Sequence, residues 1–142
     1  MASWKNSIVI HAPPDRVFAY VDDPMNLVEW LQGMVEIRNV IGTGAGQQQE
    51  WTYKMLGLLL RGQATVVEHV PGQSAVHQTI GMISSDFGYA VEPHEEGSVL
   101  TLEVEYSVPI PVLGKLAEHI ALRRNEREFQ LALENVKETL EA

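Results

Sequence analysis

The stretch that decides the fold runs from Val108 to Glu141 and reads VPIPVLGKLAEHIALRRNEREFQLALENVKETLE. Pro109 and Pro111 end an extended segment, because proline fixes φ and removes a backbone donor. From about Val112 onward, apolar residues recur at helical spacing, which predicts one long helix as far as Glu141. The apolar stripe consists of Leu113, Ala117, Ile120, Phe129, Ala132, Val136 and Leu140.

Two charged residues interrupt this apolar stripe in its middle. Arg124 and Glu128 occupy positions at which the stripe would otherwise continue. A helix of this length must bury its apolar side, so a polar break predicts that the helix covers a cavity there instead of solid core. The alternative is that the helix face turns outward and the two residues form an exposed ion pair four positions apart.

The residues before this helix are typical of an antiparallel sheet. The separators between apolar segments, such as Gly42–Gly46 and Pro71–Gln73, have the length and composition of hairpin turns. With Ser84–Asp86 and His94–Ser98 as further turns, the short connections favour an antiparallel meander. The six predicted strands are Val35–Ile41, Gln48–Leu56, Leu59–Val70, Ser74–Met82, Phe87–Glu92 and Val99–Val108.

One more strand and two short helices precede this meander. Trp4–His11 forms a predicted first strand, which two prolines end. Asp15–Val21 is the first predicted helix, and Asp22–Pro24 provides a cap and a first-turn proline for a second one through Trp30. The sequence therefore predicts one α+β domain over residues 1–142, a curved seven-stranded antiparallel sheet around a long C-terminal helix.

Composition and charge exclude several classes of function. The net charge of −9 disfavours nucleic acid and anionic membrane surfaces as partners. The chain contains no cysteine, which excludes disulfides, thiol catalysis and cysteine-ligated zinc. No segment has the length of a signal peptide core or of a membrane span of roughly 18 apolar residues, so we expect a soluble, cytoplasmic protein.

Five short motifs resemble a known family over essentially the whole length of the chain. These motifs are Ile10–Phe18, Val21–Pro24, Trp30, Pro109–Gly114 and Leu133–Glu138. They are similar to the START-like superfamily, also called SRPBCC, and most similar to its single-domain proteins of the polyketide cyclase/dehydrase type. The resemblance implies the helix-grip fold, whereas function resides in the site and not in the fold.

The resemblance and the apolar pattern together predict a ligand pocket between the sheet and the long helix. The inward positions combine apolar side chains with a few hydroxyl groups and an indole N–H, which suits a lipid, a quinone or a polyketide-like molecule. The alternative is that the same side chains simply fill the core. The predicted ligand-binding residues are Trp51, Tyr53, Met55, Phe87, Tyr89, Leu102, Val104, Tyr106, Leu113, Ala117, Ile120 and Arg124.

An enzymatic role of the cyclase, aromatase or dehydrase kind is the alternative to simple binding. Enzymes of this kind use polar groups in the cavity, and Arg124, His77 and Tyr89 are the candidate acid, base and orienting residues. No catalytic set of the family can be matched residue by residue, so we favour binding without turnover. The sequence has no Gly-x-Ser-x-Gly nucleophile motif, and we expect no cofactor.

Two histidines flank the predicted turn at Pro71–Gln73. His69 and His77 would face each other across the hairpin in one register, whereas a shift by one residue brings Glu68 opposite His77. Two ligands of uncertain register give weak support for a metal. We therefore expect surface or half-buried histidines and no metal site.

The segment Leu56–Leu60 places apolar residues at a predicted hairpin tip, where a chain normally meets water. Four interpretations stay open for it: a lid over the pocket, a homodimer contact, a loop that touches a membrane, or a turn that folds back onto the core. The sequence thus leaves a homodimer open beside the expected small-molecule partner.

Overall fold

The computed structural model describes residues 2–107 and 110–142, without the side chains of residues 110–113 and 115–118. Its elements follow one another as a strand, short helices, six strands and a long helix. They are β1 (Ala2–Ile10), α1 (Pro14–Asp22), the 3-10 helix η1 (Pro24–Asn26), α2 (Leu27–Trp30), β2 (Met34–Ile41), β3 (Gln48–Met55), β4 (Leu58–Val70), β5 (Ser74–Gly81), β6 (Ser84–His94), β7 (Gly97–Ser107) and α3 (Ile110–Glu141). This order confirms the predicted fold class.

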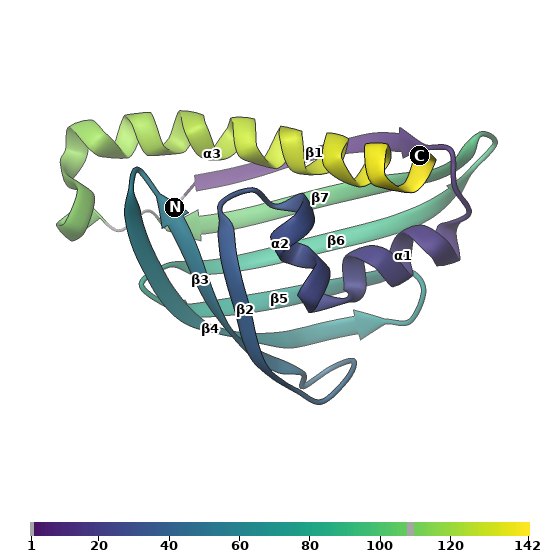
Figure 1. The fold of residues 1–142 in the computed structure, drawn as a ribbon, viewed down its shortest axis with the longest axis horizontal. Coiled ribbons are helices and arrows are strands. Elements are labelled where there is room, and N and C mark those ends of the chain that lie inside the picture. Colours follow the sequence, from purple (N-terminus) through teal and green to yellow (C-terminus); the bar gives the residue numbers. More distant parts are fainter. Residues whose placement is uncertain (1, 108–109) are drawn as a thin grey trace.

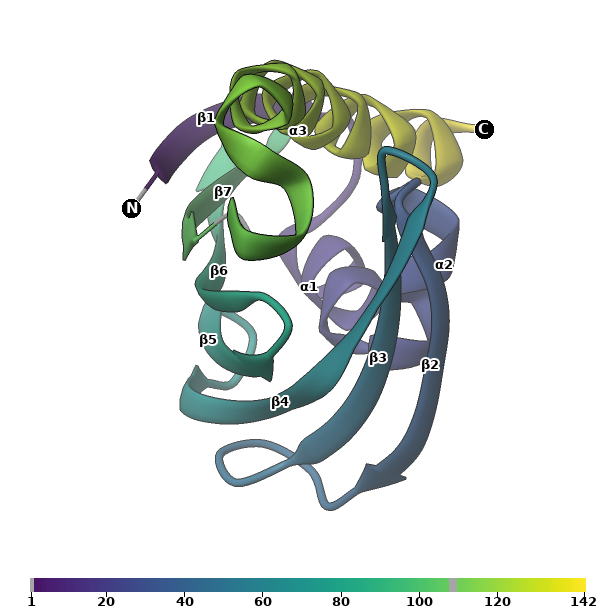
Figure 2. The same ribbon diagram turned by 90° about the vertical axis from the view of Figure 1, so that its left-hand side faces the viewer.

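One antiparallel sheet of seven strands makes up most of the fold. Its strand order is β1-β7-β6-β5-β4-β3-β2, so every hairpin joins neighbours and only β1 comes from the other end of the chain. Seen end-on, the sheet bends round from β1 to β2, and α3 lies along the open side of this curve (Figure 2). On the same side of the sheet, α1 packs against β6 and β7, and α2 packs against β2 and α3 (Figure 1).

The alternation of apolar and polar residues decides which face of the sheet is covered. In β7 buried residues alternate with more exposed ones. Glu103 and Glu105 are exposed, whereas the residues before, between and after them are buried. Each buried side chain of this size contributes on the order of 2 kcal/mol through the hydrophobic effect. Burial of Leu102, Val104 and Tyr106 agrees with the inward positions predicted for them, and the buried apolar residues of this strand are Leu100, Leu102, Val104 and Tyr106.

The buried stripe in the first half of α3 lies one position later than the sequence predicts. Ala121, Asn125 and Phe129 are buried, whereas Ile120 is 50% exposed and Arg124 is exposed. Neighbouring residues lie about 100° apart around a helix axis, so a one-residue offset turns a side chain away from the core. The prediction that Ile120 and Arg124 lie on the covered face is therefore wrong. The later part of the helix fixes its rotation, through the buried residues Ala132, Leu133, Val136 and Leu140.

A kink near its start interrupts α3. Gly114 has φ 77° and ψ 164°, which is not helical, and glycine alone adopts such a positive φ without a steric cost. The prediction of one unbroken helix from about Val112 is wrong at this residue, and Figure 1 shows the first turns folded down at the end of α3. No described helix, α3 included, combines the length and the apolar character that crossing a bilayer requires.

β6 begins earlier than the sequence predicts. Ser84–Asp86, predicted as a turn, belongs to β6, because Ser85 pairs with Thr79 in β5 and with Tyr106 in β7. Ser85 Oγ also lies 2.5 Å from Thr79 Oγ1, a cross-strand hydroxyl contact that favours strand pairing. The composition of this segment favours a turn, but pairing with the strands on both sides makes it part of the sheet.

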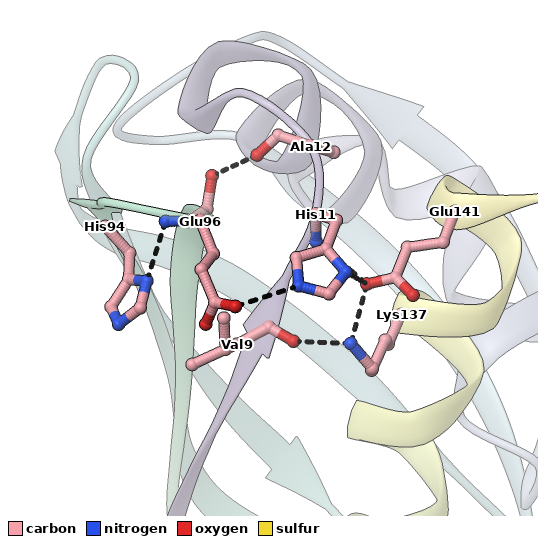
Figure 3. Close-up of polar contacts among 8 residues, drawn as sticks. Val9, His11, Ala12, His94, Glu96, Lys137 and Glu141 are labelled. Carbon is pink, nitrogen blue, oxygen red and sulfur yellow. Dashed lines mark hydrogen bonds and ion pairs between the residues drawn. The ribbon is translucent and has the colours of Figure 1, made fainter.

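Polar contacts fasten the C-terminal end of α3 to the end of β1 (Figure 3). Lys137 Nζ donates to the backbone oxygen of Val9 at 2.9 Å and lies 2.6 Å from Glu141 Oε2. The backbone N–H of His11 donates to the same carboxylate oxygen at 2.8 Å. The hydrogen bond from His11 and the contact with Lys137 lower the pKa of Glu141. The helix is thus anchored at the end farthest from the kink.

Candidate ligand pocket between the sheet and the C-terminal helix

A pocket lies between the concave face of the sheet, the short helices and α3. The cavity volume is about 90 Å³, which is room for several water molecules. The lining residues are Val21, Pro24, Leu27, Trp30, Leu31 and Met34 from the first helices and the start of β2, Gln49, Trp51, Tyr53, Met55, Ala64, His77, Thr79, Ile83, Ser85, Phe87, Tyr89, Val104 and Tyr106 from the rest of the sheet region, and Asn125 and Phe129 from α3.

Aromatic side chains dominate the pocket walls. The chain has 3 Trp, 4 Tyr and 3 Phe, ten aromatic residues in all, and seven of these ten line the pocket. Aromatic rings bring a large apolar area with few rotatable bonds, so they form rigid walls that pack well against ring-containing molecules. The seven residues are Trp30, Trp51, Tyr53, Phe87, Tyr89, Tyr106 and Phe129.

Trp51 takes its place because β4 carries a glycine opposite it. Trp51 pairs with Gly62 in the ladder, and a Cβ at Gly62 would lie 2.3 Å from Trp51 Cζ2 and 2.2 Å from the backbone oxygen of Ile80. Neither an indole ring nor a backbone oxygen can move aside at low cost, so glycine allows the close approach. One wall of the pocket thus depends on a residue without a side chain.

Two tyrosines on one side of the pocket contact polar residues of α3. Tyr53 Oη donates to the carboxylate of Glu128, and burial, together with the charge of Glu128, raises the pKa of Tyr53. Burial raises the pKa of Tyr106 as well, although the neighbouring Asn125 acts in the opposite direction. Both hydroxyl groups therefore stay protonated at ordinary pH and can take part in hydrogen bonds, but not as charged groups.

A second set of polar side chains, linked by short polar contacts, leads from the pocket towards the surface. Tyr89 Oη donates to Asp22 Oδ1 at 2.6 Å, and it lies 3.1 Å from His77 Nε2. The other oxygen of Asp22 lies 2.9 Å from His69 Nε2. His77 and Tyr89 line the pocket, while the side chains of Asp22 and His69 are 28% and 13% exposed.

The proton positions in this group follow from its acceptors. The Asp22 carboxylate can only accept, so the hydroxyl hydrogen of Tyr89 points to Asp22. Tyr89 Oη must then accept from His77, which carries its hydrogen on Nε2. His77 Nδ1 keeps its lone pair and has no hydrogen-bond partner among the described residues. Burial lowers the pKa of His77 to about 4, although the charge of Asp22 acts in the opposite direction.

Three buried polar atoms in the pocket walls have no hydrogen-bond partner within residues 2–107 and 110–142 as described. They are Nε1 of Trp30, Nε1 of Trp51 and Oε1 of Gln49, and all three residues line the pocket. An unpaired buried donor or acceptor costs about 1–3 kcal/mol. Each of these atoms is shielded from water, so the three add a cost to the pocket walls and offer no open donor or acceptor.

The structure brings most of the predicted binding residues together at this pocket. Leu102 is buried without lining it, and the side chains of Leu113 and Ala117 lie outside the described residues. Ile120 and Arg124 face solvent. The predicted residues that line the pocket are Trp51, Tyr53, Met55, Phe87, Tyr89, Val104 and Tyr106.

Sequence reasoning missed the part of the pocket that the short helices supply. Val21 and Trp30 lie on the apolar sides of their helices, a signal that could have placed them against the sheet. The sequence assigns Asp22 only to the segment that caps the second short helix. Its contact with Tyr89 joins residues 67 positions apart, and no local pattern reveals such a distance.

The observed register does not bring the two hairpin histidines face to face. The turn pairs Val70 with Ser74 and so places His69 opposite Ala75, and an irregularity between Val66 and Glu68 then brings His77 opposite Val66. Neither of the two registers considered from the sequence is therefore correct. Among the described residues, no group of three or more His, Asp or Glu side chains could hold a metal ion.

The structure divides the apolar hairpin between core and solvent. Leu60 is fully buried, whereas Leu58 is 39% and Leu59 50% exposed. The turn itself consists of Leu56 and Gly57, both with positive φ, as two-residue hairpin turns require. Part of the segment thus folds back onto the core, and two leucines remain at the surface.

Fold and pocket together define a helix-grip protein with a pocket under its long helix. The sequence profile of the family described as "Polyketide cyclase / dehydrase and lipid transport" matches residues 1–141. The chain belongs to this family, which confirms the resemblance to START-like proteins. No curated protein matches the sequence of this chain.

Several solved structures share the fold. The protein TTHA0849 from Thermus thermophilus is similar with a TM-score of 0.84 at 20% identity, covering 98% of this chain and 97% of its own. The Zhui aromatase/cyclase from a Streptomyces species has a TM-score of 0.72 at 12% identity, with coverages of 99% and 93%. The di-domain ARO/CYC StfQ from the steffimycin biosynthetic pathway has a TM-score of 0.78 at 16% identity, covering 98% of this chain and 50% of its own. At these identities the likeness concerns the fold alone.

Proposed function

We propose that this protein binds a mainly apolar, ring-containing small molecule in the pocket under α3, without turning it over. The concentration of seven of the ten aromatic residues around one pocket carries the proposal, because rigid apolar walls with a few polar groups are typical of small-molecule sites. The family description, which names lipid transport beside cyclase and dehydrase activity, supports a binding role. We propose the pocket-lining residues of the predicted set as ligand contacts, with Leu102 packing behind them. A cytoplasmic location stays a prediction.

Native mass spectrometry of the protein as purified from cells tests the proposal directly. We expect a bound small molecule that denaturing extraction releases and identifies, such as a lipid, a quinone or a polyketide. The apolar fluorescent probe N-phenyl-1-naphthylamine should bind to protein freed of this molecule. An empty protein that also fails to bind the probe would contradict the proposal.

A matched pair of variants locates the binding. Ala64 is buried and lines the pocket, so Ala64→Leu places three more carbon atoms in it. Ala90 alternates with the inward-facing Tyr89 on β6 and therefore lies on the opposite face of the sheet. We expect Ala64→Leu to weaken probe binding and Ala90→Leu to leave it unchanged. Equal probe affinities in both variants would place the binding elsewhere.

An enzyme of the cyclase, aromatase or dehydrase kind is the second candidate function. The group formed by His77, Tyr89 and Asp22 favours it, since it brings titratable side chains to an apolar pocket. Arg124 is exposed and does not line the pocket, so it no longer supports this role. If a polyketide-type substrate is converted, Tyr89→Phe should abolish turnover and Arg124→Leu should leave it unchanged. An unaltered rate in Tyr89→Phe would remove the enzymatic candidate.

A further inference from the structure

The charges around the pocket disfavour an anionic ligand. Among the described residues, neither a lysine nor an arginine lines the pocket. Two carboxylates are hydrogen-bonded to wall residues, Glu128 to Tyr53 and Asp22 to Tyr89. A buried carboxylate of a fatty acid would meet negative charges and no cation that offsets the loss of its hydration. The electrostatics therefore select neutral molecules.

The hydrogen bonds around His77 leave one acceptor open. The hydroxyl of Tyr89 is directed to Asp22, and His77 donates its Nε2 hydrogen to Tyr89. The lone pair of His77 Nδ1 is therefore fixed as an acceptor, in a side chain that lines the pocket and is only 8% exposed. Burial keeps the imidazole neutral, since it lowers the pKa of His77 to about 4.

The surroundings of this acceptor suit an aromatic hydroxyl group. Phe87 pairs with His77 across the sheet, and the ring of Tyr89 lies 5.6 Å from that of His77. A ring-bearing ligand could stack in such walls while its hydroxyl hydrogen meets the imidazole. A neutral phenol or enol offers both features at once.

We propose that His77 Nδ1 accepts a hydrogen bond from the hydroxyl group of a neutral phenol or enol bound in the pocket, and that Asp22 and Tyr89 are positioning residues which hold His77 in the required tautomer. This inference rests on the proposed binding function and specifies the class of ligand. No bond is made or broken in it, so it applies to a carrier as well as to an enzyme.

Three probes of the same ring size test the ligand class by calorimetric titration. 2-Naphthol can donate to His77, 2-methoxynaphthalene cannot, and 2-naphthoate carries a negative charge. One neutral hydrogen bond is worth about 0.5–1.5 kcal/mol, so 2-naphthol should bind about 2- to 13-fold more tightly than its methyl ether. 2-Naphthoate should bind more weakly than either neutral probe.

Two variants show whether His77 is responsible. His77→Phe keeps an aromatic side chain in the pocket and should remove the preference for 2-naphthol over the methyl ether. His119→Gln, at an exposed histidine of α3, should keep it. The preference within the unmodified protein is measured independently of these variants, so a variant that fails to fold does not decide the result.

Nitrogen-15 NMR of the His77 ring tests the positioning role. The unmodified protein should show the tautomer with hydrogen on Nε2, and Tyr89→Phe should lose this single tautomer together with part of the naphthol preference. If Tyr89→Phe keeps both, Asp22 and Tyr89 do not position His77. If both neutral probes bind equally to the unmodified protein, the inference fails while the proposed binding function stands. If no probe binds, both fail.

Discussion

His77 is a buried histidine whose protonation equilibrium is strongly shifted. Burial lowers its pKa from 6.5 to about 4, because the charged imidazole loses hydration in the pocket wall. Below about pH 6.5 the unfolded chain takes up a proton on this ring, whereas the folded protein does so only near pH 4. The free energy of unfolding should therefore fall by about 3 kcal/mol from this residue as the pH drops through that window.

Urea unfolding at a series of pH values measures this effect. His77→Gln removes the ring, so the difference in free energy of unfolding between it and the unmodified protein should change with pH between about 6.5 and 4. His119→Gln replaces an exposed histidine and should run parallel to the unmodified protein. Parallel curves for His77→Gln as well would show that His77 is not buried as a neutral residue.

At the scale of elements, two neighbouring strands make room for Trp51. A methyl group at Gly62 would collide with the indole ring and with the backbone of β5. We expect Gly62→Ala to destabilise the protein by about 1–3 kcal/mol, as overpacking of a core does, and to change the near-ultraviolet circular dichroism of the tryptophans. Thermal and urea unfolding measure the stability.

Gly88→Ala provides the matched control within the same sheet. A Cβ there would meet its nearest atoms at 3.5 Å or more, which is ordinary contact. This variant should stay within about 0.5 kcal/mol of the unmodified protein. Equal destabilisation by both substitutions would mean that Gly62 is not needed for the approach of Trp51.

The hairpin between β3 and β4 separates a structural leucine from two exposed ones. Leu60→Asp should unfold the protein, because it places a charge at a fully buried position. Leu59→Asp replaces a half-exposed side chain and should change the free energy of unfolding by less than about 0.5 kcal/mol. If the exposed leucines form a homodimer contact, Leu59→Asp also lowers the sedimentation coefficient. Unaltered sedimentation and partner binding would remove the docking role.

At the scale of the whole molecule, the pocket is walled by α2, the sheet and α3, so a ligand bound there would contact all three. A ligand that binds only the folded state stabilises it by about 2.7 kcal/mol at a concentration 100 times its dissociation constant. Saturating 2-naphthol should therefore raise the midpoint of thermal unfolding. The same addition should have a smaller effect on Ala64→Leu, whose pocket is partly filled. Equal shifts in both proteins would contradict a site at Ala64.

Much of the fold could be predicted because its signals are local. The alternation in β7, the two prolines before α1 and the spacing of Phe129, Ala132 and Val136 each follow from a few consecutive residues. The errors arise where a local signal conflicts with packing against other elements. Ser84–Asp86 has the composition of a turn but pairs on both sides, and Ile120 fits a helical stripe that the rest of α3 rotates away from the core.

The candidate site could be predicted only in part. Strand alternation placed Trp51, Tyr53 and Phe87 on the inner face, and the structure puts them on the pocket wall. The polar group around Tyr89 was out of reach, because Asp22 joins it from the end of α1 across the fold. A pattern of apolar residues does not reveal which polar side chain will meet them.

The sequence by itself determined the order of the elements, the inner face of β3, β6 and β7, and the family, since these depend on periodicity and short motifs. Only the tertiary structure decided the register of β4 and β5, the rotation of α3, and the chain of contacts from His77 through Tyr89 to Asp22. Those features depend on how elements far apart in the sequence pack together. Long-range packing also decides which ring nitrogen of His77 is left as an acceptor, and with it the hydrogen bond that a ligand would be offered.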